Sequence, residues 1–145
     1  MIRVVLDANV IVSGLISPKG TPGKILDAWL RDYFQLFISP QILEELTRVL
    51  QYPRIRERLE TNQAMELLDN MGALAGQAKG KLTLNVLTHD PSDNIYLACA
   101  VESKCDYLVT GNNDHFEEAG EIFSGVKILA PRAFLDILNI DVRLP

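Results

Sequence analysis

The chain has 145 residues, of which 48% are hydrophobic, and it carries a formal net charge of −5 with a pI near 5.0. This length suits a single domain with its own core, which we expect to span residues 1–145. The negative charge excludes a protein that coats nucleic acid through bulk positive charge, so a role on RNA needs a local basic patch or bound metal ions.

Short apolar runs alternate with amphipathic stretches along the chain. The apolar runs predict strands over residues 2–7, 34–39, 82–87, 106–111 and 126–131. The amphipathic stretches predict helices over residues 22–33, 40–51, 54–76 (with a break near residues 61–62), 91–103 and 131–138. Residues 9–24 start apolar and end in a loop rich in glycine and proline. Strands that alternate with helices predict an α/β fold, with a mainly parallel sheet covered on both faces.

The predicted helix over residues 40–51 has clear start and stop signals. Ser39 is expected to be its N-cap, Pro40 suits its first turn, and Pro53 is expected to stop it.

Location in the cell is predicted from cysteine usage and apolar runs. Cys99 and Cys105 lie in apolar surroundings without C-x-x-C spacing, which is typical of buried free thiols. Asp7 and Asn9 interrupt the apolar N-terminus before it reaches the length of a signal peptide. No run approaches the roughly 18 apolar residues that span a bilayer. We therefore expect a soluble, cytoplasmic protein without membrane contact.

Carboxylates gather at one edge of the predicted sheet. In open α/β sheets, sites form outside the carboxyl ends of the strands, where the following helices begin. Asp7 ends the first strand, and Asn112 and Asp114 follow the strand over residues 106–111. The first turns of the next helices bring four more acids to this edge: Glu44, Glu45, Asp90 and Asp93.

Helix geometry distinguishes the two glutamates. Ile42, Leu46 and Leu50 belong to the buried stripe of the helix over residues 40–51. At about 100° per residue, Glu45 flanks that stripe and Glu44 lies almost opposite its centre. We therefore expect Glu45 to lean over the sheet edge and Glu44 to face water.

The start of the helix over residues 91–103 has a structural interpretation. Asp90, Pro91 and Asp93 resemble an N-cap, an N1 proline and an acidic N3 residue, which would only complement the helix end. For Asp93 this interpretation and a place in a site are compatible.

The other acids also have structural explanations when each is taken alone. Asp7 would cap a loop, Glu45 would be a solvated flank residue, and Asp114 would start a short helix over residues 114–120. Together, however, four carboxylates on one edge would repel one another, namely those of Asp7, Glu45, Asp93 and Asp114. A hard cation such as Mg²⁺ or Mn²⁺ removes that repulsion, and it can activate a water for in-line displacement at phosphorus.

Four segments resemble the PIN-domain family in order and spacing: "VVLDANVIVSGL", "ISPQILEELTRVL", "HDPSDNIYLACAVESKCDYLVTGNNDHF" and "ILAPRAFLDIL". The resemblance covers nearly the whole chain and is least specific over residues 52–82. It is greatest to the stand-alone, VapC-like proteins described as toxin components of toxin–antitoxin systems. It implies a Rossmann-like α/β/α sandwich, a Mg²⁺- or Mn²⁺-dependent ribonuclease, an RNA substrate, an antitoxin partner and, by analogy, a homodimer.

The resemblance also implies the catalytic and metal-binding residues by position. The first aspartate of the family matches Asp7, and its helical glutamate matches Glu45 before Leu46. The aspartate that opens the D-x-x-x-L-A-x-A helix matches Asp93. Three further residues match polar positions of the site scaffold: Asn9, Ser39 and Thr110.

The fourth acid departs from the family pattern. Many relatives carry it directly after "T-G", where this chain has Asn112, and Asp114 is the nearest acidic substitute. We expect Asp114 to act as a catalytic and metal-binding carboxylate and Asn112 to assist at the metal. An amide oxygen brings no charge, so a second metal position would be weak, or filled only when RNA phosphate adds its oxygens.

Residues outside the acidic set receive smaller roles. Arg54, Arg56 and Arg58 are candidates for contact with an RNA backbone, although a solvated helix face also explains them. His115, beside Phe116, is expected to be structural. "GTPGK" lacks the spacing of a phosphate-binding loop.

One function is therefore expected, with two rivals. The leading hypothesis is a metal-dependent endoribonuclease of the PIN class. A phosphatase with an aspartate nucleophile would need an acid two residues after the first, where Asn9 stands. A PIN-fold module that binds RNA or protein, with weak or no cleavage, is the rival that Asn112 favours.

Overall fold

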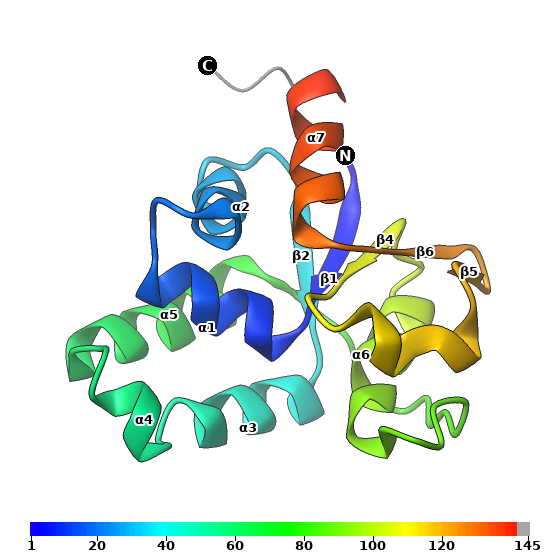
Figure 1. Cartoon of the computed structure of the whole chain (residues 1–145), viewed down its shortest axis with the longest axis horizontal. Helices are drawn as coiled ribbons and strands as arrows, with labels where there is room; N and C mark the ends of the chain where they lie inside the picture. The colour runs from blue at the N-terminus through cyan, green and yellow to red at the C-terminus, as the bar shows by residue number, and fades with distance from the viewer. Residues whose placement is uncertain (142–145) are drawn as a thin grey trace.

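A six-stranded sheet with the strand order β3-β2-β1-β4-β6-β5 forms the centre of the structure (Figure 1). The computed structural model describes residues 1–141, so the last four residues of the expected domain lie outside the described part. The strands are β1 (Arg3–Leu6), β2 (Gln35–Ile38), β3 (Gly76–Gln77), β4 (Tyr107–Val109), β5 (Ile122–Phe123) and β6 (Val126–Leu129). All neighbours pair in parallel except β5, which is antiparallel to β6. The α/β fold with a mainly parallel sheet is confirmed.

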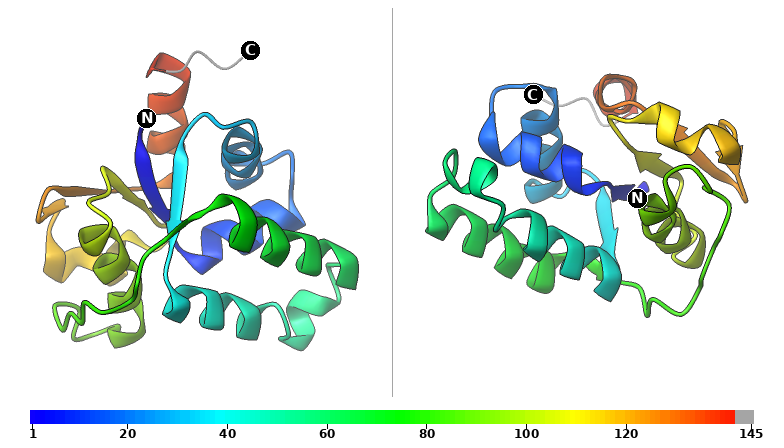
Figure 2. Two further views of the ribbon diagram at one scale, coloured as in Figure 1. Left: turned by 180° about the vertical axis from the view of Figure 1, so that it is seen from behind. Right: turned by 60° about the horizontal axis from the view of Figure 1, so that its bottom comes forward.

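Helices cover both faces of this sheet. They are α1 (Ala8–Ile16), α2 (Thr21–Leu30), α3 (Pro40–Val49), α4 (Pro53–Arg56), α5 (Thr61–Leu74), α6 (Asn94–Glu102) and α7 (Pro131–Asp141), with 3₁₀ helices η1 (Pro91–Asp93) and η2 (Asn113–Ala119). α6 packs against β1, β2 and β4, and α2 contacts α1 and α7. Figure 1 shows α1, α3, α4 and α5 in the left half of the molecule and α6 below β4, with β6 and β5 further to the right, and Figure 2 shows the same elements from behind. Within the described residues, no helix is long and apolar enough to cross a membrane.

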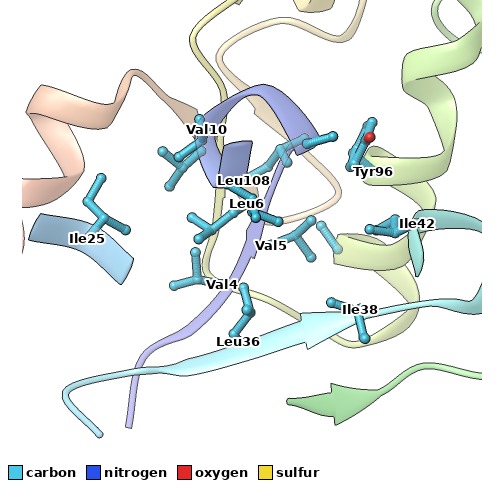
Figure 3. Close-up of a cluster of buried hydrophobic side chains, with 14 of the residues drawn as sticks. Val4, Val5, Leu6, Val10, Ile25, Leu36, Ile38, Ile42, Tyr96 and Leu108 are labelled. Carbon is cyan, nitrogen blue, oxygen red and sulfur yellow. The ribbon is translucent and has the colours of Figure 1, made fainter. Parts of the chain in front are cut away.

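β1 is buried on both faces. Figure 3 shows Val10 of α1 and Ile25 of α2 on one side of this strand, and Ile42 of α3 and Tyr96 of α6 on the other. These side chains and those of residues 4–6 belong to one hydrophobic core. A strand covered by helices on both sides has no solvent face, and for this reason its sequence is a continuous apolar run.

The largest difference from the sequence prediction lies directly after β1, where α1 replaces the expected irregular stretch. The valines and isoleucines of this segment, and Gly14, have low intrinsic helix propensity. Packing overrides that preference, because most of the helix is buried. A Cβ at Gly14 would lie 2.8 Å from both Leu26 and the carbonyl of Pro22, so glycine permits the close approach of α2.

The strand predicted over residues 82–87 is wrong. The segment is irregular, and Gly76 and Gln77 pair with β2 instead. The alternation of apolar residues there does turn Leu84 and Val86 toward the core. The carboxylate of Glu102, however, accepts the N–H groups of Lys79, Lys81 and Leu82, so a side chain takes the place of a partner strand.

Smaller elements differ in their ends. α3 ends at Val49, and Pro53 begins α4, so Pro53 does not stop α3 as predicted. The predicted break near residues 61–62 is confirmed, because α5 begins at Thr61 behind the N-cap Glu60. The two-residue strand β5 was not predicted. Cys99 and Cys105 are buried and free, as expected.

Candidate metal centre

Asp7 and Thr110 lie side by side, each directly after one of two neighbouring strands, β1 and β4. Leu6 pairs with Val109 in the register of β1 and β4, so the residues that follow emerge together at the carboxyl ends of the strands. The N–H of Asp7 donates to the carbonyl of Val109 at 3.1 Å, and the Thr110 hydroxyl donates to Oδ2 of Asp7. Thr110 Oγ1 also accepts the N–H of Asn112 at 3.0 Å. Parallel pairing thus places Asp7 at the predicted edge.

The Asp7 carboxylate is buried, with 4% of the residue exposed. Its Oδ1 accepts the N–H of Val10 at 2.9 Å, which makes Asp7 the N-cap of α1. Burial raises the pKa of the Asp7 carboxyl above its usual value, the hydrogen bonds from Thr110 and Val10 oppose that rise, and the charge of Asp93 adds to it. Because both donors are uncharged, a cation is the natural partner for the ionised group.

Tyr96 shows that three of the predicted acids lie near one another. This residue is 2% exposed. Burial raises the pKa of Tyr96 far above its usual value, and the negative charges of Glu45, Asp7 and Asp93 raise it further. The charges of carboxylates at the end of β1, on α3 and in η1 therefore all act on one phenol.

Glu45 and Glu44 are placed as helix geometry predicts. Glu44 is exposed, whereas 22% of the Glu45 side chain is accessible. Arg48 lies one turn further along α3, with Nη2 at 3.6 Å from Oε1 of Glu45. The buried Ser39 is the N-cap of α3, since its Oγ accepts the N–H of Ile42 at 3.2 Å. Ser39 thus fixes the start of the helix that carries Glu45.

Asp93 contacts His115, which the sequence analysis assigned a structural role. Nδ1 of His115 lies 2.8 Å from Oδ2 of Asp93, and Nε2 lies 3.8 Å from Oδ1 of Asp90. Burial raises the pKa of Asp93 although the hydrogen bond to His115 lowers it, and that same bond raises the pKa of His115. Ligand atoms of Asp90, Asp93 and His115 all lie within 4.8 Å of one another, so this cluster could hold a metal ion.

Asp90 takes the N-cap position of η1, as predicted, but its side chain makes no capping hydrogen bond. It faces His115 instead. The only sequence signal for this contact is that His115 follows the same strand as Thr110, and therefore starts from the same sheet edge.

The remaining predicted residues of the site are Asp114, Asn112 and Asn9. Asp114 is exposed and, with Lys127 and Leu129, lines a surface hollow beside β6. Asn112 is half-buried, and Asn9 is exposed on α1. A catalytic role for Asp114 stays a prediction.

The three arginines lie beyond the C-terminal end of α3. Arg54, Arg56 and Arg58 are exposed, on α4 and directly after it. α3 has ten residues and is therefore about 15 Å long. In Figure 1, α4 lies at the end of α3 that points away from the sheet. An RNA strand that reached both the acids and the arginines would run along α3.

The donor set at the sheet edge fits a hard divalent cation. Asp7, Glu45 and Asp93 offer carboxylate oxygens, which Mg²⁺ and Mn²⁺ prefer. Burial is the largest cause of the raised pKa values of Asp7 and Asp93, so each carboxyl is ionised at a cost in free energy. An ion bound there would remove the penalty.

The fold and this acidic edge define a PIN domain. A family model described as "PIN domain" matches residues 3–114, and the chain belongs to this family. It is also similar to the uncharacterised protein MJ1680 of Methanocaldococcus jannaschii, at 31% identity over 145 residues that cover 99% of this chain and 86% of that protein. PIN domains are generally metal-dependent nucleases that act on RNA, which indicates a nuclease here.

Proposed function

We propose that the chain is a single-domain, Mg²⁺- or Mn²⁺-dependent endoribonuclease that hydrolyses RNA phosphodiester bonds. The observation that carries this proposal is the convergence of Asp7, Glu45 and Asp93 around Tyr96. Three acids from distant segments have little structural reason to be kept together, because their mutual repulsion destabilises the fold.

Asp7, Glu45 and Asp93 would hold the ion, directly or through water. When bound, the ion supplies an activated water and stabilises the charge that develops on the phosphate during in-line displacement. The residues of the chain hold the carboxylate of Asp7 in a fixed orientation. Thr110 fixes Oδ2 of Asp7, the amide of Val10 fixes Oδ1, and no side-chain nucleophile is required.

The substrate would be held mainly through its phosphates. The net charge of −5 disfavours tight binding of RNA by the free protein, so we infer weak contact bridged by metal, or basic surface from a partner chain. The arginines of residues 54–58 are among the basic residues that an RNA strand along α3 would meet.

Cleavage of a labelled single-stranded RNA tests the proposal directly. Purified protein should cut the RNA with Mg²⁺ or Mn²⁺ and stop when EDTA is added. The Asp7→Asn variant keeps an N-cap acceptor for α1 and should lose activity by more than about 100-fold. Equal cleavage by this variant would rule out the proposed site, and a DNA strand of the same sequence tests the choice of RNA.

The further proposal that the protein is the toxin of a toxin–antitoxin pair rests on the resemblance to VapC-like proteins. Induced expression of the wild type in bacteria should arrest growth, and expression of Asp7→Asn should not. Growth arrest by both the wild type and Asp7→Asn at equal protein levels would show that toxicity does not depend on the nuclease site. A homodimer, proposed by analogy, is checked by the molar mass in solution.

The second candidate function is a PIN-fold module that binds RNA or protein with weak or no cleavage. Asn112 favours it, because an amide stands where many relatives carry the fourth acid. Calorimetric titration with Mg²⁺ and Mn²⁺ discriminates the two, since a module with a degraded site should bind neither ion near neutral pH.

A further inference from the structure

A histidine and a further carboxylate lie beside the three acids. His115 lies between two carboxylates, with Nδ1 at 2.8 Å from Oδ2 of Asp93 and Nε2 at 3.8 Å from Oδ1 of Asp90. Each ring nitrogen therefore faces a different acid. Asp93 links this pair to the first group, because its charge also acts on Asp7.

The short contact defines the state of the ring. When Asp93 is ionised it can accept a hydrogen bond but not donate one, so Nδ1 of His115 is then the donor. In the neutral imidazole, Nε2 then carries a lone pair, on the side where Asp90 lies. A carboxylate that holds one nitrogen of a histidine while the other nitrogen binds an ion is the usual surrounding of a metal-bound histidine.

The long contact has the length expected of two ligands that share an ion. A distance of 3.8 Å between Nε2 and Oδ1 of Asp90 exceeds the roughly 3.2 Å limit of an ordinary hydrogen bond. Two atoms that each lie about 2.1 Å from one ion can be at most about 4.2 Å apart. The gap between His115 and Asp90 falls between these limits.

The segments that carry His115 and Asp90 are tied together. Glu118 of η2 accepts the N–H groups of Thr88 and His89 at 2.6 and 3.1 Å and the hydroxyl of Thr88, and these bonds hold the pKa of Glu118 below its usual range. The loop that leads to Asp90 is thereby fixed to the 3₁₀ helix that carries His115.

A second anchor fixes the same loop to α6. The buried Asn94 accepts the N–H of Leu87 and donates to the carbonyls of Leu87 and Pro91, each at 3.0 Å. The loop is thus held on both sides of Asp90. The side chains of His115 and Asp90 are 41% and 35% exposed, so an ion can enter from solvent.

We propose that His115 and Asp90 form a second cation position beside Asp93, which takes a divalent transition metal such as Mn²⁺ in preference to Mg²⁺. Imidazole nitrogen is a good ligand for transition metals, whereas Mg²⁺ demands oxygen and dehydrates reluctantly. This second position deepens the proposed function. It rests on the proposed nuclease site only because the two share Asp93. In this second position His115 would be a metal ligand, whereas the nearby Asn112 brings no charge to an ion.

Electron spin-echo spectroscopy of bound Mn²⁺ tests the proposal without any assay of activity. The chain has two histidines, so any ¹⁴N coupling from imidazole must come from His115 or His89. His89 is exposed and lies in the same loop as Asp90, which makes His89→Gln the matched control. We expect ¹⁴N coupling in the wild type and in His89→Gln, and none in His115→Gln.

Calorimetry supplies the second measurement. His115→Gln and Asp90→Asn should each weaken Mn²⁺ binding by about tenfold or more and change Mg²⁺ binding by less than about threefold. Circular dichroism checks that both variants fold, which the exposure of the two side chains favours.

The outcomes separate this proposal from the proposed nuclease. Bound Mn²⁺ without ¹⁴N coupling in the wild type, or coupling that survives in His115→Gln, overturns the second position and leaves cleavage through Asp7 untouched. An absence of Mn²⁺ binding overturns it as well. Coupling from His115 in a protein that cuts no RNA supports the second position and contradicts the nuclease.

Discussion

The hydroxyl of Thr110 donates to Asp7 from the neighbouring parallel strand, and the same oxygen accepts the N–H of Asn112. One fully buried side chain thus connects the residue that ends β1 with the segment that follows β4. The register in which Leu6 pairs with Val109 produces this contact, so the sheet itself orients the first acid of the candidate site.

Replacement of Thr110 by valine should therefore destabilise the fold although the two side chains have the same shape. The buried carboxylate of Asp7 would lose a hydrogen-bond donor, and the backbone N–H of Asn112 would lose its acceptor. Together these losses cost about 2–4 kcal/mol. Thr110→Ser keeps the hydroxyl and is the control. Urea unfolding of the three proteins measures the difference, and equal stability of the valine and serine variants would contradict the role of the hydroxyl.

Ionisation of Asp7 should lower the stability of the metal-free protein as the pH rises from acid toward neutral. The folded pKa of Asp7 lies above that of the unfolded chain. In the interval between the two values the unfolded chain releases a proton that the folded protein retains, so the free energy of unfolding decreases as the pH rises through it. Asp93, whose pKa is raised as well, acts in the same direction.

The Asp7→Asn variant isolates this effect, because an amide does not titrate and still caps α1. In EDTA its unfolding free energy should fall less steeply with pH than that of the wild type. Addition of Mg²⁺ should stabilise the wild type, by about 2.7 kcal/mol when the ion is at 100 times its dissociation constant, and should leave the variant unchanged. Identical pH profiles in EDTA would show that burial of Asp7 carries no penalty.

The adjacent glutamates give a test of site placement within one helix. Glu45→Gln should reduce RNA cleavage by about 100-fold or more, because it removes one charge from the group around Tyr96. Glu44→Gln alters an exposed residue one position away and should change cleavage by less than about threefold. Both rates are measured at saturating Mg²⁺, and equal losses would mean that helix geometry does not identify the ligand.

Periodicity and strand pattern predicted much of this arrangement. The apolar runs of β1 and β4 and the helical spacing of α3 are local signals, and they place Asp7, Thr110 and Glu45 at one edge. The helix α1 was not predicted, because its stability comes from contacts with α2, and local helix propensity does not reflect such contacts.

The contact of His115 with Asp93 and Asp90 could not be predicted in the same way. It joins residues 22 positions apart (Asp93 and His115) and 25 apart (Asp90 and His115), which lie in an irregular loop and in two 3₁₀ helices. Its geometry depends on the hydrogen bonds of Glu118 and Asn94, which are polar contacts without a periodic pattern. A histidine next to a phenylalanine has a more ordinary explanation in sequence alone.

Restoring the fourth acid should strengthen the site. Asn112 is half-buried and bonded through its N–H to Thr110, so Asn112→Asp places a charge close to Asp7 and should raise Mg²⁺ affinity by about tenfold. If Asp114 supplies the fourth carboxylate, as the sequence predicts, Asp114→Asn should reduce cleavage by about tenfold or more although this side chain is exposed. A large loss in Asp114→Asn would support the sequence-based assignment of the fourth carboxylate to Asp114.

Asn94 should be as important to the fold as an apolar core residue. Its side chain makes three hydrogen bonds, to the N–H and carbonyl of Leu87 and to the carbonyl of Pro91. Asn94→Ala would leave these backbone groups without their partner and should lower the free energy of unfolding by about 2–4 kcal/mol. Because the loop that carries Asp90 would be released, Mn²⁺ affinity should fall as well.

Asn85→Ala is the control, since this asparagine is exposed in the segment just before the loop and its removal should change stability by less than about 0.5 kcal/mol. Urea unfolding and Mn²⁺ calorimetry measure both variants. If Asn94→Ala binds Mn²⁺ as tightly as the control while it is clearly less stable, the anchor serves the fold alone. A parallel loss of stability and Mn²⁺ affinity would instead show that the loop must be held in place for Asp90 to face His115.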